Sequence, residues 1–441
     1  MESVIGIRRE DKNDWERRTP LIPSDVRTLV NEGIRVIVQP SRIRVFSDEE
    51  YARAGAVVQE SLSPCRVVFA VKEIPTGLIE EKKAYVFFSH VVKGQKHNMP
   101  MLQRLLDLKC SLIDYEKVTD NDGKRLIFFG TQAGHAGTID TLHALGRRLE
   151  TEGLPSPFSA IRMAHAYSTF VEAKEAIGEV GSRIERDGLP AAISPLVIGV
   201  VGYGHVGTGV LDVLDCLPLE TIAPRDLTAL DLSGLSNRKI YRVLFKEEDM
   251  VEPVEPGGVF ELYDYYARPE RYRGIFARYL PRLSVLVNAA YWDKRYPRVI
   301  TREDARRLYG GKEPPMLRVI GDISCDIDGG VEFTVKETTP DHPTFVYLPA
   351  ENKIADGVEG RGPVVMSIDN LPCELPREAS EFFSKVLLPF VESITHADLS
   401  KPFEADGLPD EIQRAVIAYH GELAPAFGYL KGHLSGKETS R

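Results

Sequence analysis

The sequence has no apolar run that approaches the length of about 18 residues that a membrane-spanning helix needs. Its opening stretch, MESVIGIRREDKNDWERR, is charged from the start and has no apolar signal core. Basic residues are not in excess either, because the net charge is −10, which gives no electrostatic support for binding nucleic acid or an acidic membrane. We therefore expect a cytoplasmic protein whose partners are small molecules, with homo-oligomerisation left open.

Cysteine is also scarce. The five cysteines are odd in number and far apart: Cys65, Cys110, Cys216, Cys325 and Cys373. They form no metal-type pair, so we expect reduced, buried thiols and no metal site. The remaining composition, 43% hydrophobic and 27% charged over 441 residues, is that of a globular protein of two or three domains, or of two large ones.

Strand-like and helix-like segments alternate over the first 130 residues. Strands are expected at 4–10, 34–40, 66–73, 84–90 and 110–116, and helices at 24–32, 47–55 and 98–109. This alternation predicts a parallel α/β sheet. Ser24 and Gly33 are the residue types that begin and end a helix, so we expect them to bound the first one.

A second α/β unit is expected from near Pro195, after a helical connector at 130–153. Its further strands are expected at 283–291 and 316–324. After Gly330 the pattern loosens, except for a helix at 377–394. The predicted fold class is α/β, with two Rossmann-like domains, parallel sheets and an active-site cleft between the domains.

A glycine-rich turn follows the strand that opens the second unit. The segment LVIGVVGYGHVGTG contains Gly202, Gly204 and Gly207 in the spacing G-x-G-x-x-G, with Tyr203, His205 and Val206 at the intervening positions. After a strand and before a helix, this spacing is typical of a dinucleotide site: the first glycine makes the turn, the second lets the backbone approach a pyrophosphate, and the third packs the helix on the strand. We therefore expect NAD or NADP as cofactor.

The choice between the two cofactors is left open by the sequence. An acid that holds the ribose is expected about 20 residues further on, at the end of the next strand. Arg225 and Asp226 lie there side by side. Asp226 would favour an unphosphorylated ribose and Arg225 a 2′-phosphate.

Three neighbouring strands of the first unit end in ionisable residues. One ends on Lys72 and Glu73, the next on His90, and the third on Asp114 and Glu116. The carboxyl ends of parallel strands meet at one edge, where such sheets bind ligands, so we expect these groups to converge. A lysine and a histidine tuned by carboxylates can exchange protons near pH 7.

Arginines that could hold an acid substrate lie near the end of the first strand. Arg8, Arg9, Arg17 and Arg18 are the candidates there, and Arg125 is another. In the second unit, Asp322 and Asp326 follow a strand and are expected to face the cofactor.

Several long blocks resemble lysine–2-oxoglutarate reductase, the saccharopine-forming half of aminoadipic semialdehyde synthase, and its relative, the lysine-forming saccharopine dehydrogenase: "DWERRTPLIP", "AVKE", "FFSHVVKGQ", "NAAYWDKRYPRVIT", "GDISCDIDGGVEF" and "SIDNLPCELPREASEFFSKVLLPF". The resemblance covers roughly residues 4–430, and the wider group includes alanine dehydrogenase. It implies a substrate-binding domain at 1–133 and about 334–441, and a dinucleotide-binding domain at 134–333.

The resemblance also implies a reaction and a role for each site residue. Such enzymes join L-lysine to 2-oxoglutarate and reduce the imine to saccharopine with NAD(P)H, or run in reverse. Lys72 and His90 match the proton-transfer pair, and Arg18 matches the arginine that binds a substrate carboxylate. Glu73 and Glu116 match carboxylates that tune the pair, and Asp326 matches an aspartate near the nicotinamide.

Two alternatives remain beside this hypothesis. One is a related dehydrogenase of alanine dehydrogenase or opine type that uses ammonia or another amine. The other is a nucleotide-sensing or assembly protein that has kept the fold without the activity. The resemblance does not extend to the second half of the bifunctional enzyme, so either a separate protein oxidises saccharopine or the reaction runs towards lysine.

Overall fold

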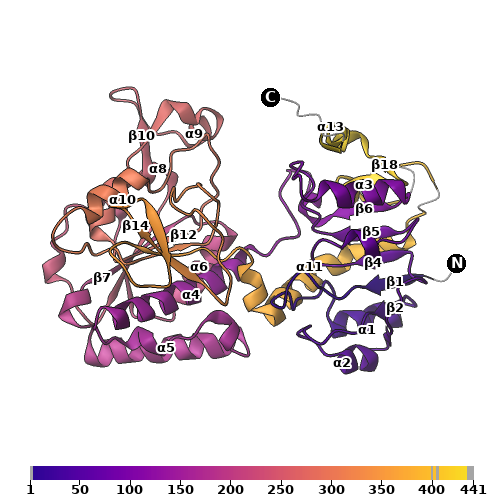
Figure 1. Cartoon of the computed structure of the whole chain (residues 1–441), viewed down its shortest axis with the longest axis horizontal. Helices are drawn as coiled ribbons and strands as arrows, with labels where there is room; N and C mark the ends of the chain where they lie inside the picture. Colours follow the sequence, from indigo (N-terminus) through magenta and orange to yellow (C-terminus); the bar gives the residue numbers. More distant parts are fainter. Residues whose placement is uncertain (1–2, 399–400, 404–406, 435–441) are drawn as a thin grey trace. The chain divides into compact units, whose positions relative to one another are not determined.

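The chain folds into two compact α/β units (Figure 1). The computed structural model describes residues 3–398, 401–403 and 407–434. Unit 1 consists of Met1–Phe129 and Pro376–Arg441, and unit 2 of Gly130–Leu375. The chain therefore crosses between the units twice.

Unit 1 is built on a sheet whose strand order, within the described residues, is β18-β17-β6-β5-β4-β1-β2-β3. The strands are β1 (Val4–Ile7), β2 (Arg35–Val38), β3 (Val57–Val58), β4 (Val67–Phe69), β5 (Ala84–Phe87), β6 (Ser111–Asp114), β17 (Val416–Tyr419) and β18 (Glu422–Leu423). From β6 through β3 all neighbours pair in parallel, as the alternation predicts. Every residue of β1, β4, β5 and β6 is buried, which explains their near-continuous apolar sequences.

Helices cover the unit 1 sheet. They are α1 (Pro23–Asn31), α2 (Asp48–Arg53), α3 (Met99–Asp107), α11 (Pro376–His396), α12 (Asp410–Gln413) and α13 (Leu430–Leu434). Ser47 caps α2 in a capping box with Glu50. Ser24 does not cap α1, which instead begins at Pro23, a residue preorganised for a first helical turn.

Unit 2 is built on a second sheet, with the order β15-β14-β16-β13-β12-β7-β9-β8 in the described residues. The strands are β7 (Leu196–Val201), β8 (Leu219–Thr221), β9 (Ile240–Phe245), β12 (Val285–Asn288), β13 (Val319–Asp322), β14 (Thr344–Leu348), β15 (Lys353–Asp356) and β16 (Val364–Met366). A separate antiparallel pair joins β10 (Val251–Pro253) to β11 (Tyr272–Gly274). The strands predicted at 283–291 and 316–324 are confirmed as β12 and β13.

Both faces of the second sheet are covered. The helices are α4 (Gly130–Thr151), α5 (Phe170–Asp187), α6 (His205–Leu214), α7 (Pro224–Leu227), α8 (Glu247–Met250), α9 (Leu262–Ala267) and α10 (Arg302–Tyr309). Alternate residues of β7 join different cores: Ile198 and Val200 belong to the core with α4 and α5, whereas Val197 and Val201 pack with α10 on the other face. Figure 1 shows α4 and α5 on one side of this sheet and α10 on the other.

Both sheets carry antiparallel strands that the sequence did not predict. β17 pairs antiparallel with β6, and β14 pairs antiparallel with both β15 and β16. The predicted return to the first domain at about residue 334 also differs from the structure, because β14, β15 and β16 belong to the second sheet and the chain re-enters unit 1 at Pro376. These strands pair with partners far along the chain, and the local sequence pattern after Gly330 does not show which partners they take.

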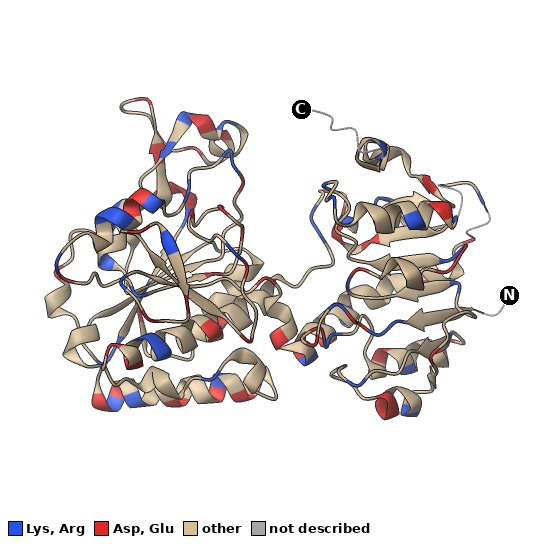
Figure 2. Ribbon diagram, in the orientation of Figure 1, with Lys and Arg blue, Asp and Glu red and all other residues tan. Residues whose placement is uncertain are grey.

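Charges of both signs are interspersed on the helices of both units, as α5 and α10 illustrate (Figure 2). No helix in the described part of the chain is both long enough and apolar enough to cross a bilayer.

A buried pair of carboxyl groups joins α4 to the segment that precedes the return to unit 1. Asp140 lies on α4, Glu374 ends the 3₁₀ helix η10 (Leu371–Glu374), and the two carboxyl groups lie close enough to influence each other's charge. Ala164 N–H donates to Asp140 Oδ1 over 2.8 Å, and His165 Nδ1 lies 2.8 Å from Glu374 Oε2. Burial raises the pKa of Asp140 and raises that of Glu374 to about 7, so the folded pair keeps a proton that two exposed acids would lose.

Asp140→Asn should therefore flatten the dependence of stability on pH. A folded pKa above the unfolded value of about 4.3 means that stability is lost as pH rises from about 4 to about 7, at up to about 1.4 kcal/mol per pH unit per proton. Asparagine can donate to Glu374 without a shared proton. Urea unfolding at pH 5 and pH 7 should show a smaller difference in the variant than in the wild type, with exposed Asp187→Asn as control. An equal slope in both proteins would contradict the shared proton.

Candidate active site and dinucleotide cradle

Lys72, Glu73 and His90 lie just past the ends of two adjacent parallel strands of unit 1. β4 ends at Phe69 and pairs with β5, which ends at Phe87. His90 takes a positive φ of 50°, an uncommon conformation for a non-glycine residue. The structure thus places Lys72, Glu73 and His90 at neighbouring strand ends, and convergence of the whole predicted set stays a prediction.

Glu73 connects His90 to Lys12. His90 Nδ1 lies 2.6 Å from Glu73 Oε1, and Lys12 Nζ lies 3.3 Å from Glu73 Oε2. Burial alone would raise the pKa of Glu73, but its hydrogen bond to His90 and the nearby positive charges lower it well below the usual range. Glu73 therefore stays ionised and fixes the orientation of the imidazole.

Lys72 is partly buried beside this pair. Burial lowers the pKa of its ammonium, and the positive charges of Arg18 and Lys12 lower it further, against the opposing effect of Glu16 and Glu73. Within the described residues, no hydrogen bond or ion pair engages its Nζ. A lysine in such surroundings gives up its proton more readily than one in water.

Arg18 is held in a buried, two-point ion pair. Its Nε and Nη2 donate to the two carboxylate oxygens of Glu16 over 2.7 and 2.6 Å, and the two side chains are 2% and 0% exposed. The guanidinium also lies 4.3 Å from the ring centroid of Phe129. Glu16 thus occupies one edge of the guanidinium that was predicted to bind a substrate carboxylate, so a substrate must approach another edge.

The two remaining residues predicted in this unit, Glu116 and Arg125, contact other groups. Glu116 follows β6, and its N–H donates to buried Asp114 over 2.8 Å. Arg125 is exposed, with its guanidinium 6.0 Å from the ring centroid of Phe88. In the described chain, no hydrogen bond or ion pair links either side chain to Lys72 or His90, and their substrate-binding roles stay predictions.

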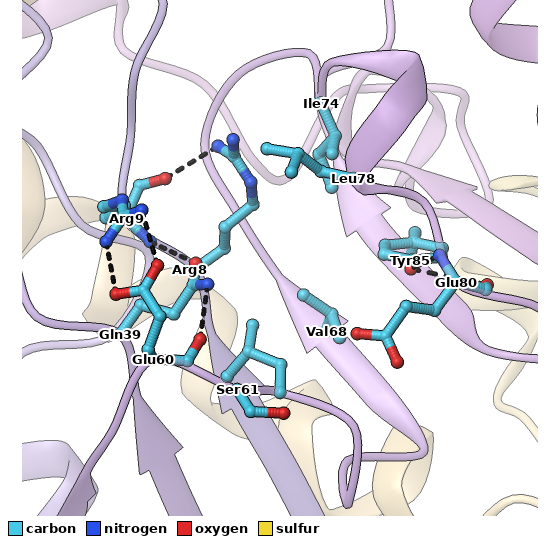
Figure 3. Close-up of a pocket in the computed structure, with 11 residues that line it drawn as sticks. Arg8, Arg9, Gln39, Glu60, Ser61, Val68, Ile74, Leu78, Glu80 and Tyr85 are labelled. Atoms are coloured by element: carbon cyan, nitrogen blue, oxygen red, sulfur yellow. Dashed lines mark hydrogen bonds and ion pairs between the residues drawn. The ribbon is translucent and has the colours of Figure 1, made fainter.

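Arg8 and Arg9 line a different pocket of unit 1, drawn in Figure 3 with Val68, Leu78 and Tyr85. The Arg9 guanidinium already pairs with both oxygens of Glu60, at 2.6 and 2.7 Å, and buried Arg8 donates to the carbonyl of Arg9 over 2.7 Å. Arg8 also forms an ion pair with Asp11, so both charges are compensated within the protein. Neither Lys72 nor His90 lines this pocket.

The glycine-rich turn of unit 2 forms an open backbone cradle between β7 and α6. Gly202 has φ of 98°, and a Cβ there would lie 2.7 Å from the carbonyl oxygen of Ala289. A Cβ on Gly204, the N-cap residue of α6, would meet no atom within 4 Å, so the space above it is open. Open space at a helix N-terminus fits the pyrophosphate of a dinucleotide. Tyr203, His205 and Val206 lie in or next to this turn.

An acidic residue that the sequence reasoning missed lies against this turn. β7 pairs with β9 and not with β8, so the strand next to the cradle ends at Phe245 and is followed by Glu247. Tyr203, from the turn itself, donates to Glu247 Oε2 over 3.0 Å, and Tyr266 donates to Oε1 over 2.8 Å. Glu247 thus takes the place at which such folds hold the ribose of the cofactor.

Arg225 and Asp226 are not placed beside the cradle. They lie on α7, after the edge strand β8, with side chains 87% and 63% exposed. The sequence prediction assumed that the next strand in the chain is also the next strand in the sheet. The order β7-β9-β8 removes that basis, because β9 and not β8 is the strand next to β7.

Asp322 and Asp326 occupy different environments. Asp322 is 1% exposed: its Oδ1 accepts from Asn288 and Ser324, each over 2.8 Å, and its Oδ2 accepts from Thr334 over 2.6 Å. This network ties the ends of β12 and β13 together, and the role of Asp322 towards the cofactor stays a prediction. Asp326 lies in the exposed loop beyond. Within the described residues, no group of three or more His, Cys, Asp or Glu side chains could hold a metal ion.

Two family models match the chain. The alanine dehydrogenase/PNT N-terminal domain matches residues 6–136, and the C-terminal domain of the same family matches residues 275–425. Among solved structures, an L-alanine dehydrogenase superposes with a TM-score of 0.63 at 20% identity, covering 98% of this chain and 99% of that one.

Two relatives with longer chains are more similar to this chain in sequence than that L-alanine dehydrogenase is. Alpha-aminoadipic semialdehyde synthase from Bos taurus is 37% identical over 100% of this chain and 49% of its own, and the enzyme of that name from Arabidopsis thaliana is 37% identical over 97% of this chain and 41% of its own. The chain thus spans about half the length of these relatives or less. Saccharopine dehydrogenase [NAD(+), L-lysine-forming] from Yarrowia lipolytica is 26% identical over 89% of this chain and 93% of its own.

Proposed function

The chain belongs to the alanine dehydrogenase/PNT family, and on that premise we propose that it interconverts saccharopine with L-lysine and 2-oxoglutarate by means of a nicotinamide cofactor. Unit 1 would bind the substrates and unit 2 the dinucleotide. The names of the relatives that match nearly the whole chain support this choice of substrates. A cytoplasmic location and a cleft between the domains stay predictions.

One observation carries the proposal: a desolvated lysine lies at the end of one strand, and a histidine held by a carboxylate lies at the end of the next. Joining an amine to a keto acid needs a base that takes a proton from the substrate ammonium. Loss of water from the carbinolamine then needs an acid at the hydroxyl oxygen. Lys72, with its lowered pKa, and His90, oriented by Glu73, fit these two tasks.

The other groups bind and orient. Arg18, oriented by its ion pair with Glu16, would bind one substrate carboxylate, and Glu73 would keep the imidazole of His90 turned towards the reacting atoms. A nicotinamide, when bound, supplies the hydride, and the cradle at Gly202 and Gly204 would hold its pyrophosphate.

We propose further that the cofactor is NAD rather than NADP. Glu247 presents a carboxylate whose two oxygens are fixed by tyrosine hydroxyls, and Glu248 and Asp249 follow it. A carboxylate at this place accepts hydrogen bonds from the ribose hydroxyls and repels a 2′-phosphate. Lys246, which directly follows the strand, lies with its Nζ 5.8 Å from the ring centroid of Tyr203.

The proposed activity is tested by following cofactor oxidation with 2-oxoglutarate and either lysine or ammonia. Turnover with lysine and no comparable turnover with ammonia is expected, for NADH more than for NADPH. Turnover with ammonia alone would instead favour a related amino-acid dehydrogenase that aminates the keto acid with ammonia. No turnover with either amine would remove the catalytic hypothesis.

His90→Gln should lower turnover about 100-fold, because one positioned proton transfer contributes roughly 10²–10⁴-fold. Glutamine can still donate to Glu73 but cannot exchange a proton. Cofactor affinity, measured by fluorescence titration, should not change. The matched control is His97→Gln, an exposed histidine in the loop that follows. Near-normal turnover in the His90 variant would remove this side chain from the mechanism.

A further inference from the structure

Glu10 is a buried carboxylate to which the proposed reaction assigns no part. It follows β1 and is 5% exposed. Its Oε1 accepts the backbone N–H of Val71 over 2.7 Å, and its Oε2 accepts that of Lys72 over 3.0 Å. One side chain thus holds two consecutive peptide groups at the point where the candidate proton carrier leaves its strand.

The sheet itself leaves these two N–H groups without a strand partner. The pairing of β1 with β4 ends at Phe69, whose carbonyl accepts the N–H of Arg8 over 2.9 Å. On the β5 side, Ala70 still donates to Val86 and Val71 still accepts from Phe88. Without Glu10, two donors at a buried strand end would lose their acceptors, at about 1–3 kcal/mol for each.

We propose that Glu10 is a positioning residue that holds the backbone of Lys72 so that its side chain stays in its partly buried place at the end of β4. This inference rests on the proposed function only in giving Lys72 a catalytic task. The restraint itself is a property of the folded chain. A released strand end would let Lys72 move towards water, and its proton affinity would return towards that of an ordinary lysine.

The charges around Glu10 make this restraint sensitive to pH. Burial and the nearby carboxylate of Glu16 raise the pKa of Glu10 to about 7, whereas its two N–H bonds and the charge of Arg8 lower it. The phenol of Tyr115 also lies within its electrostatic influence. A protonated carboxyl has one good acceptor oxygen in place of two, so one of the N–H bonds weakens below about pH 7.

The test compares the full-length wild type with Glu10→Gln and Glu10→Ala. An amine-reactive label is applied across a range of pH, and its incorporation at Lys72 is read by peptide mass spectrometry. The labelling midpoint of Lys72 should rise by about one pH unit in the variants, because its desolvation is relieved. Turnover should fall about tenfold in the variants, with Michaelis constants within about twofold of the wild-type values. The Glu10→Gln variant, which keeps one acceptor oxygen, should keep more turnover than Glu10→Ala. The control is Glu332→Gln, which loses a carboxylate bound to the N–H of Arg302 in unit 2 and should change neither quantity.

A second measurement needs no variant. Hydrogen exchange in the wild type should show the amides of Val71 and Lys72 losing about tenfold in protection between pH 8 and pH 6, as the carboxylate takes up a proton. Unchanged protection, or an unchanged labelling midpoint in folded Glu10→Gln, would overturn the inference. Because neither readout uses a substrate, a shifted midpoint in a protein that is inactive with lysine would sink the proposed function and leave the restraint standing.

Discussion

Lys72→Met is expected to lower turnover by about 100-fold or more while leaving cofactor affinity unchanged, since a positioned proton transfer contributes roughly 10²–10⁴-fold. The reason lies in the surroundings of the ammonium, in which burial and the charges of Arg18 and Lys12 lower its pKa. Methionine has a similar length and apolar stem, so it fills the same space without a proton to exchange. Turnover is measured with saturating substrates, and cofactor affinity by fluorescence titration.

The control for this variant is Lys93→Met, which removes an exposed lysine from the loop that follows His90. Loss of activity confined to the Lys72 variant, with the same unfolding midpoint in both proteins, would assign the effect to chemistry rather than to folding. If Lys72→Met instead kept wild-type turnover and weakened only substrate affinity, the lysine would be a binding group and His90 would have to act alone.

The strand-end chemistry could be predicted from the sequence because it depends on one local regularity. Parallel strands read as short apolar runs, and the residues that follow them meet at one edge of the sheet. Lys72, Glu73 and His90 obey this rule, and the structure joins His90 to Glu73. The glycine spacing at Gly202 was equally readable, because a turn with φ of 98° excludes most other residue types.

The order of strands could not be read in the same way. Nothing in the short sequence of β8 says that it lies at the sheet edge, outside β9, and this order displaces Asp226 from the cradle. Similarly, the antiparallel edge strands β14 and β17 form through partners far along the chain. Strand pairing of this kind depends on tertiary packing more than on local preference.

The burial of two carboxylates, Glu10 and Glu16, could not be predicted from the sequence for a different reason. Both lie in REDKNDWERR, which reads as a solvated run of charges. In the fold, Glu16 pairs with Arg18, and Glu10 accepts two backbone N–H groups at the end of β4. Buried charges require such partners, and the partner of Glu10 is backbone some 60 residues away, which leaves no sequence signal.

Glu247→Arg is expected to reverse the cofactor preference. The carboxylate lies at the end of the strand next to the cradle, and Tyr203 and Tyr266 fix both of its oxygens. Arginine would remove the acceptor for the ribose hydroxyls and offer a two-point donor to a 2′-phosphate. Hydrogen bonds to charged groups contribute about 1.5–3 kcal/mol, so the ratio of kcat/KM for NADPH to that for NADH should rise by about 100-fold.

Asp226→Arg is the matched control. Its spacing from the glycine-rich turn along the chain favours Asp226 as the acid that binds the ribose, whereas the order of strands in the sheet does not. Its side chain is 63% exposed on α7, after the edge strand, so the same charge change there should leave the cofactor ratio within about twofold. The opposite pattern, a shifted ratio in the Asp226 variant and none in the Glu247 variant, would mean that the ribose is bound at β8. Strand adjacency would then be the wrong guide to this site, and the NAD assignment would lose its physical basis.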